Sequence, residues 1–263
     1  TSRGLGDVYK RQIRDSGTTY ACSRQTGAPD GFQYCARWGR PNADSNTSGV
    51  YFGNSFETAT SQHLAGKTVI VSFYARKGSS FSAAGSILNF VLGSSTSMEM
   101  GTWGGGTTNT TINNNFTLTT SWQRFITTTG VVPSGNLGNK FFFNYTPVGT
   151  TSDANDYVEI TGIQLEIGSV ATPFSRAGGD IQGELAKCQR YFQKIGTDGN
   201  PYQLFTIVTA ESSTTAWGPI YLPVKMRVTP SGSFTSTQSW NFQGQLISNA
   251  NMYFDPNQTG PSI

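Results

Sequence analysis

Histidine, cysteine and charge are all scarce in this sequence. Its 263 residues include one histidine and three cysteines, and only 13% of them are charged. A single histidine argues against histidine-rich metal sites and against a serine–histidine–aspartate hydrolase. The sequence has no block of lysine and arginine, which argues against nucleic-acid binding. It also has no apolar run of 18 residues, so we expect no membrane insertion.

Small hydroxylated residues and glycine are abundant instead. The chain contains 34 threonines, 28 serines, 31 glycines and 17 asparagines. Aromatic residues make up 13% of the chain, more than is typical of disordered segments. This composition indicates an all-β, hydroxyl-rich domain of the extracellular or virion type.

The three cysteines, Cys22, Cys35 and Cys188, are unevenly spaced and too few for a disulfide framework or a zinc site. Cys22 and Cys35 either pair across a hairpin or stay as buried thiols. We favour the thiols.

The two ends of the chain are unlike the rest. Residues 1–12 resemble translated sequencing-adapter read-through from environmental DNA, and the alternative is a flexible natural N-terminus. They carry +2 of the net charge of +3, so the remainder is near neutral and predicts no acidic partner. Residues 257–263 lack a strand pattern, and we expect the chain to be a fragment at both ends.

Short apolar runs between glycine, asparagine and proline predict an antiparallel two-sheet sandwich from about residue 20 to residue 174. In the clearest strand, Val69, Val71 and Phe73 share one face. Trp122 is expected in the core, and Gly101–Asn115 is expected to be a mobile loop. The predicted strands are Gly49–Phe52, Lys67–Ala75, Ser86–Leu92, Trp122–Thr128, Lys140–Tyr145 and Asp156–Glu166.

After residue 176 the apolar period changes to that of a helix. Asp180 is a suitable N-cap and Gly196 a suitable end, so we predict a connecting helix within residues 177–196. Its stripe either docks on the sandwich or meets copies of itself, which makes it a candidate oligomerisation surface. The stripe consists of Ile181, Leu185, Cys188, Phe192 and Ile195.

Strand-like runs return after the helix and predict a smaller, incomplete β domain over residues 197–263. The runs are Tyr202–Ala210, Ala216–Val228, Ser233–Phe242 and Gln245–Ile247.

Two family resemblances cover most of residues 20–230. The order of five segments resembles the jelly-roll carbohydrate-binding modules of the xylan- and glucan-binding type, which implies a jelly-roll β-sandwich over residues 13–176. Those segments are Leu64–Thr68, Val71–Arg76, Leu118–Arg124, Val131–Pro133 and Val158–Ile167.

The second resemblance is to bacteriophage tail-fibre and receptor-binding proteins. It is carried by Ile163–Phe174 and Glu184–Phe192, and more loosely by Gly218–Ile220 and Leu222–Arg227. It implies a homotrimeric virion protein of the phage tail, made in the host cytoplasm. Its partners would be other tail proteins and bacterial surface polysaccharide.

Glycan binding needs an exposed aromatic surface with amides or hydroxyls nearby. Trp103 in its polar loop is the main candidate, with Trp38, Tyr51 and Asn109 as neighbours. The alternative is that these aromatic residues fill the core or anchor a loop.

An oxygen-rich segment before the last strand of the sandwich is a candidate for structural calcium, which prefers six to eight oxygen ligands. The alternative is a turn that starts the strand. Structural calcium is frequent in modules of the resembled type. The candidate ligands are Asp153, Asn155, Asp156 and Glu159.

Catalysis has the least support in the sequence, because no pair of carboxylates can be placed across a glycosidic bond. We therefore expect a binding protein with no catalytic residues. The alternatives are a carbohydrate-binding module of a secreted bacterial polysaccharidase and a virion-associated depolymerase.

Overall fold

A computed structural model describes residues 3–4, 12–14, 21–98, 109–149, 151–176, 179–193, 209–210, 216–217, 222–227, 239–242 and 245–248. The chain divides into two compact units, Thr1–Glu184 and Leu185–Ile263. The division falls inside the helix that was expected to connect two domains. The predicted boundaries at residues 12, 176 and 196 remain predictions.

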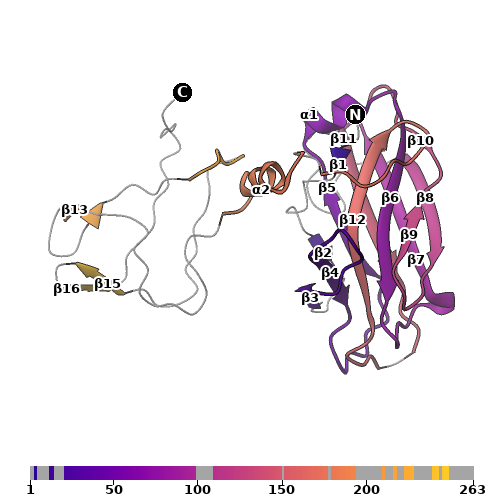
Figure 1. Ribbon diagram of the computed structural model, residues 1–263, viewed down its shortest axis with the longest axis horizontal. Helices are drawn as coiled ribbons and strands as arrows, with labels where there is room; N and C mark the ends of the chain where they lie inside the picture. The colour runs from indigo at the N-terminus through magenta and orange to yellow at the C-terminus, as the bar shows by residue number, and fades with distance from the viewer. Residues whose placement is uncertain are drawn as a thin grey trace. The chain divides into compact units, whose positions relative to one another are not determined.

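The first unit is an antiparallel β-sandwich of the jelly-roll type (Figure 1). One sheet has seven strands in the order β10-β6-β12-β4-β3, with β9 beside β6 and β1 beside β12. These strands are β1 Arg3–Gly4, β3 Ala21–Gln25, β4 Cys35–Gly39, β6 Thr68–Lys77, β9 Gln123–Ile126, β10 Gly130–Val131 and β12 Tyr157–Ile167.

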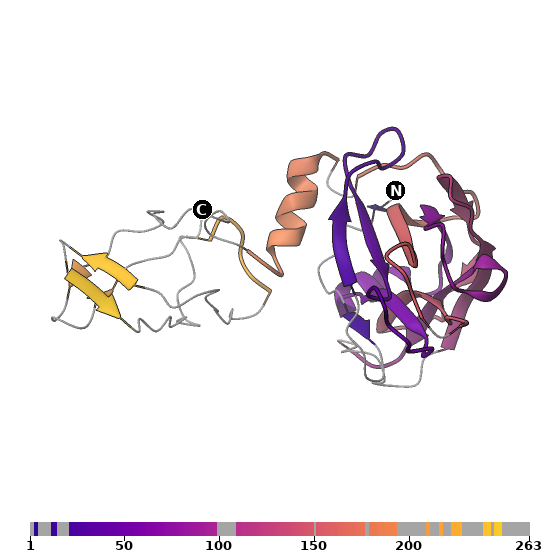
Figure 2. The same ribbon diagram turned by 90° about the horizontal axis from the view of Figure 1, so that it is seen from below.

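The second sheet has five strands in the order β2-β5-β11-β7-β8, and Figure 2 shows the same sandwich turned by 90°. These strands are β2 Gln12–Arg14, β5 Val50–Ser55, β7 Ile87–Ser95, β8 Asn109–Thr117 and β11 Gly138–Tyr145. Helix α1 (Thr58–Leu64) joins β5 to β6, and a short 3-10 turn (Ala84–Ser86) precedes β7. The predicted all-β sandwich is therefore confirmed.

Aromatic residues fill the space between the two sheets. Phe73 on β6 is fully buried, and its ring lies between 4.8 and 6.2 Å from those of Phe90, Phe116, Phe125 and Phe143. The predicted inward face of β6 is confirmed, because its three residues all belong to this core. Truncating a ring at such a position costs about 3–5 kcal/mol.

Two expectations about the sandwich were wrong. Residues 109–115, expected in a loop, belong to β8 and pair with β7. The run of asparagines made this strand hard to recognise in the sequence, although Ile112 and Phe116 both point toward the core. Phe125 on β9, and not Trp122 just before this strand, faces the core, because Phe125 lies opposite Phe73. Trp122 is half-buried on the outer side.

Helix α2 runs from Ile181 to Gln189 and is shorter than expected. The predicted N-cap is confirmed, because Asp180 Oδ1 accepts a 2.7 Å hydrogen bond from the Gly183 N–H. Among the described residues, no helix is long and apolar enough to cross a membrane.

The described residues of the second unit form two short antiparallel ladders. Strand β13 (Thr209–Ala210) pairs with β14 (Ala216–Trp217), and β15 (Ser239–Phe242) pairs with β16 (Gln245–Ser248). Three of these strands lie within runs predicted to be strand-like, and β16 extends one residue beyond its predicted run.

Candidate functional site

The outer face of the five-stranded sheet carries amides, two aromatic rings and one lysine. On β11, Phe141, Phe143 and Tyr145 point into the core, so the alternate residues lie on the outer face. Strand pairing places them in rows with residues of β5, β7 and β8. We call this surface the amide face: Tyr51, Ser55, Asn89, Val91, Asn113, Asn115, Lys140, Phe142 and Asn144, with Gly53 and Gly93 between them.

Four asparagines on three strands form a hydrogen-bonded ladder across the amide face. Asn89 is central: its Oδ1 accepts from Asn144 Nδ2 at 2.8 Å. Its Nδ2 donates to Asn113 Oδ1 at 2.7 Å and Asn115 Oδ1 at 2.8 Å. Asn113 and Asn115 are exposed, and their Nδ2 groups donate to no residue in the described part of the chain. The ladder therefore holds two amide donors toward solvent in fixed positions.

The aromatic pair on this face consists of Tyr51 and Phe142. Their ring centroids lie 6.0 Å apart with an interplanar angle of 61°, and both rings are half-buried. Gly53 lies directly opposite Phe142, where a Cβ atom would come within 2.8 Å of the Phe142 Cβ and 2.3 Å of the Phe141 carbonyl oxygen. Glycine at this position is what lets β5 and Phe142 come so close.

Lys140 lies at the end of the amide face nearest Ser55 and Gly93. Burial lowers the pKa of its ammonium group below the ordinary 10.5. Within the described residues, Nζ makes no hydrogen bond and no ion pair. The face therefore holds a half-buried cation beside fixed amides and an aromatic pair.

The outer face of the seven-stranded sheet is arranged differently, because a buried carboxylate lies at its centre. Glu159 is 0% exposed and binds two arginines: Oε1 accepts from Arg37 Nη2 at 2.6 Å and Oε2 from Arg76 Nε at 2.6 Å. Tyr157 lies 3.8 Å from the Arg37 guanidinium and Trp122 lies 4.9 Å from that of Arg76. These contacts neutralise and cover the carboxylate.

Segments outside the strands close over this second face. Phe32, from the loop between β3 and β4, packs against Tyr74 and Phe174 at centroid distances of 5.4 and 4.8 Å. Beneath it lies Gly162, at φ +59°, where a Cβ would lie 2.5 Å from the Phe32 ring. Trp122 Nε1 donates to the carbonyl of Gly27 in the same loop, at 2.8 Å.

Residues after β12 are hydrogen-bonded to side chains of β12 on the same side of the sandwich. Glu166 Oε2 accepts from the Thr172 N–H at 3.0 Å, and Gln164 Oε1 accepts from the Ser175 N–H at 2.7 Å. Both side chains are buried. Chain contacts therefore occupy the outer face of the seven-stranded sheet.

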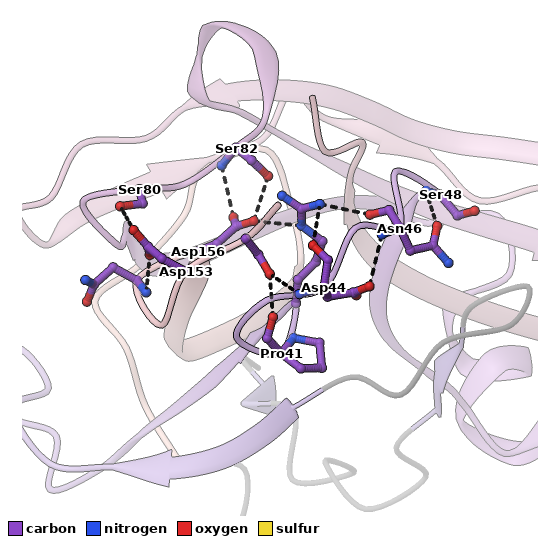
Figure 3. A network of polar contacts seen from close by, with 11 residues as sticks. Pro41, Asp44, Asn46, Ser48, Ser80, Ser82, Asp153 and Asp156 are labelled. Carbon is purple, nitrogen blue, oxygen red and sulfur yellow. Dashed lines mark hydrogen bonds and ion pairs between the residues drawn. The ribbon is translucent and has the colours of Figure 1, made fainter. Parts of the chain in front are cut away.

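A third polar cluster joins the loops at one end of the sandwich (Figure 3). Arg40 and Asp156 are buried and form an ion pair of 2.8 Å. The Ser82 backbone N–H and hydroxyl also donate to Asp156, at 3.0 and 2.8 Å. Arg40 Nη1 donates to the Asn46 carbonyl at 2.9 Å. All these groups satisfy one another, so the cluster is a structural crosslink between loops.

The candidate calcium ligands are not brought together as a cation site. Glu159 is bound by two arginines, and Asp156 is bound by Arg40 and Ser82. Asp153 is exposed and accepts from the Ser80 hydroxyl at 2.6 Å and the Asn155 N–H at 2.6 Å, which lower its pKa. No metal-binding group of three such side chains occurs among the described residues. The set does not fit calcium, and the alternative of a turn before the strand is the better description.

The residues predicted to contact glycan lie in different parts of the structure. Tyr51 lies on the amide face. Trp38 is 0% exposed in the core, stacked on Phe52, so its assignment to a glycan site was wrong. Asn109 is exposed but pairs with Ser94, which faces inward, so it lies off the amide face. Trp103 lies outside the described residues.

The candidate oligomerisation stripe is only partly described. Ile181, Leu185 and Phe192 are 59%, 54% and 60% exposed, and Cys188 is half-buried. Phe192 lies beyond the end of α2, and Ile195 lies outside the described residues. The stripe remains a prediction. Cys22 and Cys35 of the sandwich are not joined in a disulfide, as favoured: Cys35 is buried and Cys22 partly so.

Sequence reasoning missed most of the amide face. Its signal was the period of two in β11, where Lys140, Phe142 and Asn144 alternate with the core residues. The same period on β7 and β8 would have placed Asn89, with Asn113 and Asn115, on one surface.

Comparisons with known proteins give likeness of fold only. The chain is similar to the enzymatically active domain of tailspike protein 4 from bacteriophage CBA120, with 11% identity and a TM-score of 0.41 over 63% of this chain and 20% of that one. It is also similar to the CBM22-2 xylan-binding domain of Paenibacillus barcinonensis Xyn10C, with 14% identity and a TM-score of 0.40 over 64% and 99%.

A third similar structure is the CBM22-1–GH10 part of the Clostridium thermocellum xylanase Xyn10B, with 8% identity and a TM-score of 0.39 over 66% of this chain and 29% of that one. No family model and no curated protein matches the chain. With these identities and TM-scores, the function has to be argued from the residues of this chain.

Proposed function

We propose that the chain binds polysaccharide through the amide face. The observation that carries this proposal is the asparagine ladder, which holds exposed amide donors beside the Tyr51–Phe142 pair. Sugars offer hydroxyl groups to amides and C–H groups to aromatic rings. Fixed donors bind without first losing side-chain freedom, which lowers the entropic cost of association.

The size of the amide face fits an oligosaccharide better than a single sugar. From Lys140 to Asn144 the strand rises about 13 Å, and from β5 to β8 the sheet is about 14 Å wide. Contacts spread over such a surface are individually weak, so several copies of the site on one assembly would strengthen attachment.

An array of bacterial surface and plant-wall polysaccharides, probed with the full chain, tests the proposal. We expect binding that falls at least tenfold in Tyr51→Ala and in Asn89→Ala. Tyr34→Ala and Asn42→Ala are matched controls, because both residues are exposed and lie off the amide face. Equal binding by all four variants, or no binding by the parent chain, would refute the proposal.

We further propose a phage tail fibre or receptor-binding protein as the setting of this binding. Support comes from the resemblance of Ile163–Phe174 and Glu184–Phe192 to such proteins, and from the exposed apolar side chains of Leu185 and Phe192. Light scattering behind size exclusion tests it: we expect the mass of three protomers, reduced to one in the Leu185→Asp/Phe192→Asp double variant.

A monomeric parent chain would contradict the fibre and favour the module of a secreted polysaccharidase. Release of reducing ends from a bound polysaccharide would favour the depolymerase.

A further inference from the structure

Lys140 is the one charged residue among those named for the amide face, which β2 borders with Arg14 paired opposite Tyr51. It lies two residues along β11 from Phe142, about 7 Å, and its cross-strand neighbours are Ser55 and Gly93. Neither neighbour carries a negative charge that could neutralise an ammonium group, and no hydrogen bond joins Lys140 Nζ to the Ser55 hydroxyl. Lys140 therefore places a positive charge within reach of a ligand that also contacts the aromatic pair.

Four other buried or half-buried basic side chains of the sandwich each have a polar partner. Arg37 and Arg76 bind Glu159, and Arg40 binds Asp156. Lys77 Nζ donates to the Ser86 hydroxyl at 2.7 Å. Lys140 has no such contact within the described part of the chain. A cation that has lost water without gaining a partner is destabilising, and an anionic ligand would supply the missing interaction.

We propose that the amide face selects acidic polysaccharides, with Lys140 pairing with a sugar carboxylate while the asparagine ladder binds neighbouring hydroxyl groups. This inference rests on the proposed function and names its ligand class. Charge complementarity carries it, since the named residues of the face include a cation and no carboxylate. The lowered pKa of Lys140 is consistent with a group that an anion would stabilise.

Paired ligands that differ only in charge test the inference. The full chain is titrated with polygalacturonic acid, with each acidic polysaccharide that binds on the array, and with the carboxyl-reduced form of each. We expect reduction of the carboxyl groups to weaken binding about tenfold. Raising the salt from about 0.05 to 0.5 M should weaken binding of the acidic form more than that of the reduced form.

Variants of Lys140 distinguish the effect of its positive charge on affinity from the effect of its side-chain shape. Lys140→Gln should weaken binding of acidic ligands about tenfold and leave the reduced ligands unchanged, whereas Lys140→Arg should retain at least half of the affinity. Lys67→Gln is the control, because Lys67 is exposed and directly precedes β6 of the other sheet. Thermal unfolding of each variant checks that it folds.

The outcomes distinguish this inference from the proposed function. If neutral glycans bind as well as acidic ones, and Lys140→Gln changes affinity less than twofold while Asn89→Ala abolishes binding, the inference is wrong and the function stands. If Asn89→Ala and Lys140→Gln both leave binding unchanged, or if nothing binds, the proposed function itself fails.

Discussion

The two outer faces of the sandwich differ in whether their polar groups are bound by other groups of the chain. On the seven-stranded sheet, two arginines enclose the Glu159 carboxylate, Tyr157 and Trp122 cover those arginines, and Phe32 packs on Tyr74 and Phe174. On the five-stranded sheet, Asn113 and Asn115 lie exposed and Lys140 lacks a partner among the described residues. Polar groups that are fully satisfied inside the chain stabilise the fold, whereas groups that are fixed but unsatisfied are available to a ligand.

This comparison predicts which property each face controls. Changes on the seven-stranded face should alter the free energy of unfolding. Changes on the amide face should alter ligand affinity and change the free energy of unfolding by no more than about 1 kcal/mol.

Glu159→Gln is expected to have the largest effect on stability. The variant leaves Arg37 and Arg76 close together without the carboxylate that holds them, and removing one partner of a buried ion pair costs about 3–5 kcal/mol. Because each arginine is about one-third exposed and can regain water, we expect the lower end, about 3 kcal/mol. Urea unfolding measures it, and glycan binding by the folded fraction should persist.

Glu184→Gln is the control for Glu159→Gln, since its pair with Arg176 has partly exposed side chains. An exposed pair contributes less than about 1 kcal/mol. Equal losses from the two variants would contradict the view that Glu159 organises its face.

Gly162→Ala is expected to have the next largest effect. The new Cβ would meet the Phe32 ring at 2.5 Å, and φ +59° is unfavourable for alanine, so we expect a loss of about 1–3 kcal/mol. In a Phe32→Ala background the cost of φ and a 3.1 Å contact with the Tyr74 ring remain, and the loss from Gly162→Ala should fall to about 1 kcal/mol. A double-mutant cycle by urea unfolding measures this coupling, and strict additivity would show that the loop does not press on Gly162.

The sandwich could be predicted from the sequence because its core strands are apolar at alternate positions. Strand β6 shows this directly, since Val69, Val71 and Phe73 reach the core as predicted. Strand β8 could not be found in this way, because only Ile112 and Phe116 break its run of asparagines and threonines. Trp122, just before β9, and Phe125 on that strand are both aromatic, and hydrophobicity alone does not show which one faces inward.

The candidate site was less predictable, because it depends on register between strands. Asn89, Asn115 and Asn144 are far apart in sequence and meet only through pairing of β8, β7 and β11. The acidic segment before β12 was recognised as polar, but its partners Arg40, Arg37 and Arg76 come from distant strands. Without them, carboxylates that bind arginine cannot be told from carboxylates that bind a metal.

Asn89→Ala tests the amide face with a smaller effect on stability. It removes the centre of the ladder, whose hydrogen bonds are part-buried or exposed, so we expect a loss of about 1 kcal/mol in urea unfolding. The loss of glycan affinity should exceed this. A stability loss as large as that of Glu159→Gln would mean that the ladder is a structural element and would remove the contrast between the faces.

The pH dependence of stability tests the environment of Lys140 with the smallest expected effect. Its pKa is lowered by burial, so between the lowered value and 10.5 the unfolded chain binds more protons than the folded chain. The unfavourable contribution of the charged side chain is therefore fully present at neutral pH and is relieved as the pH rises through that window.

We compare the parent chain with Lys140→Met, because tyrosines and other lysines titrate in both and cancel in the difference. The variant should be the more stable at pH 7, and its advantage should shrink as the pH rises toward 10.5, measured by urea unfolding at each pH. A saturating acidic glycan should reverse the order at pH 7, since it binds the folded parent chain about tenfold more tightly than the folded variant and therefore stabilises the parent more. If the stability advantage of the variant is constant with pH, better packing of the methionine side chain, and not removal of a buried charge, stabilises it.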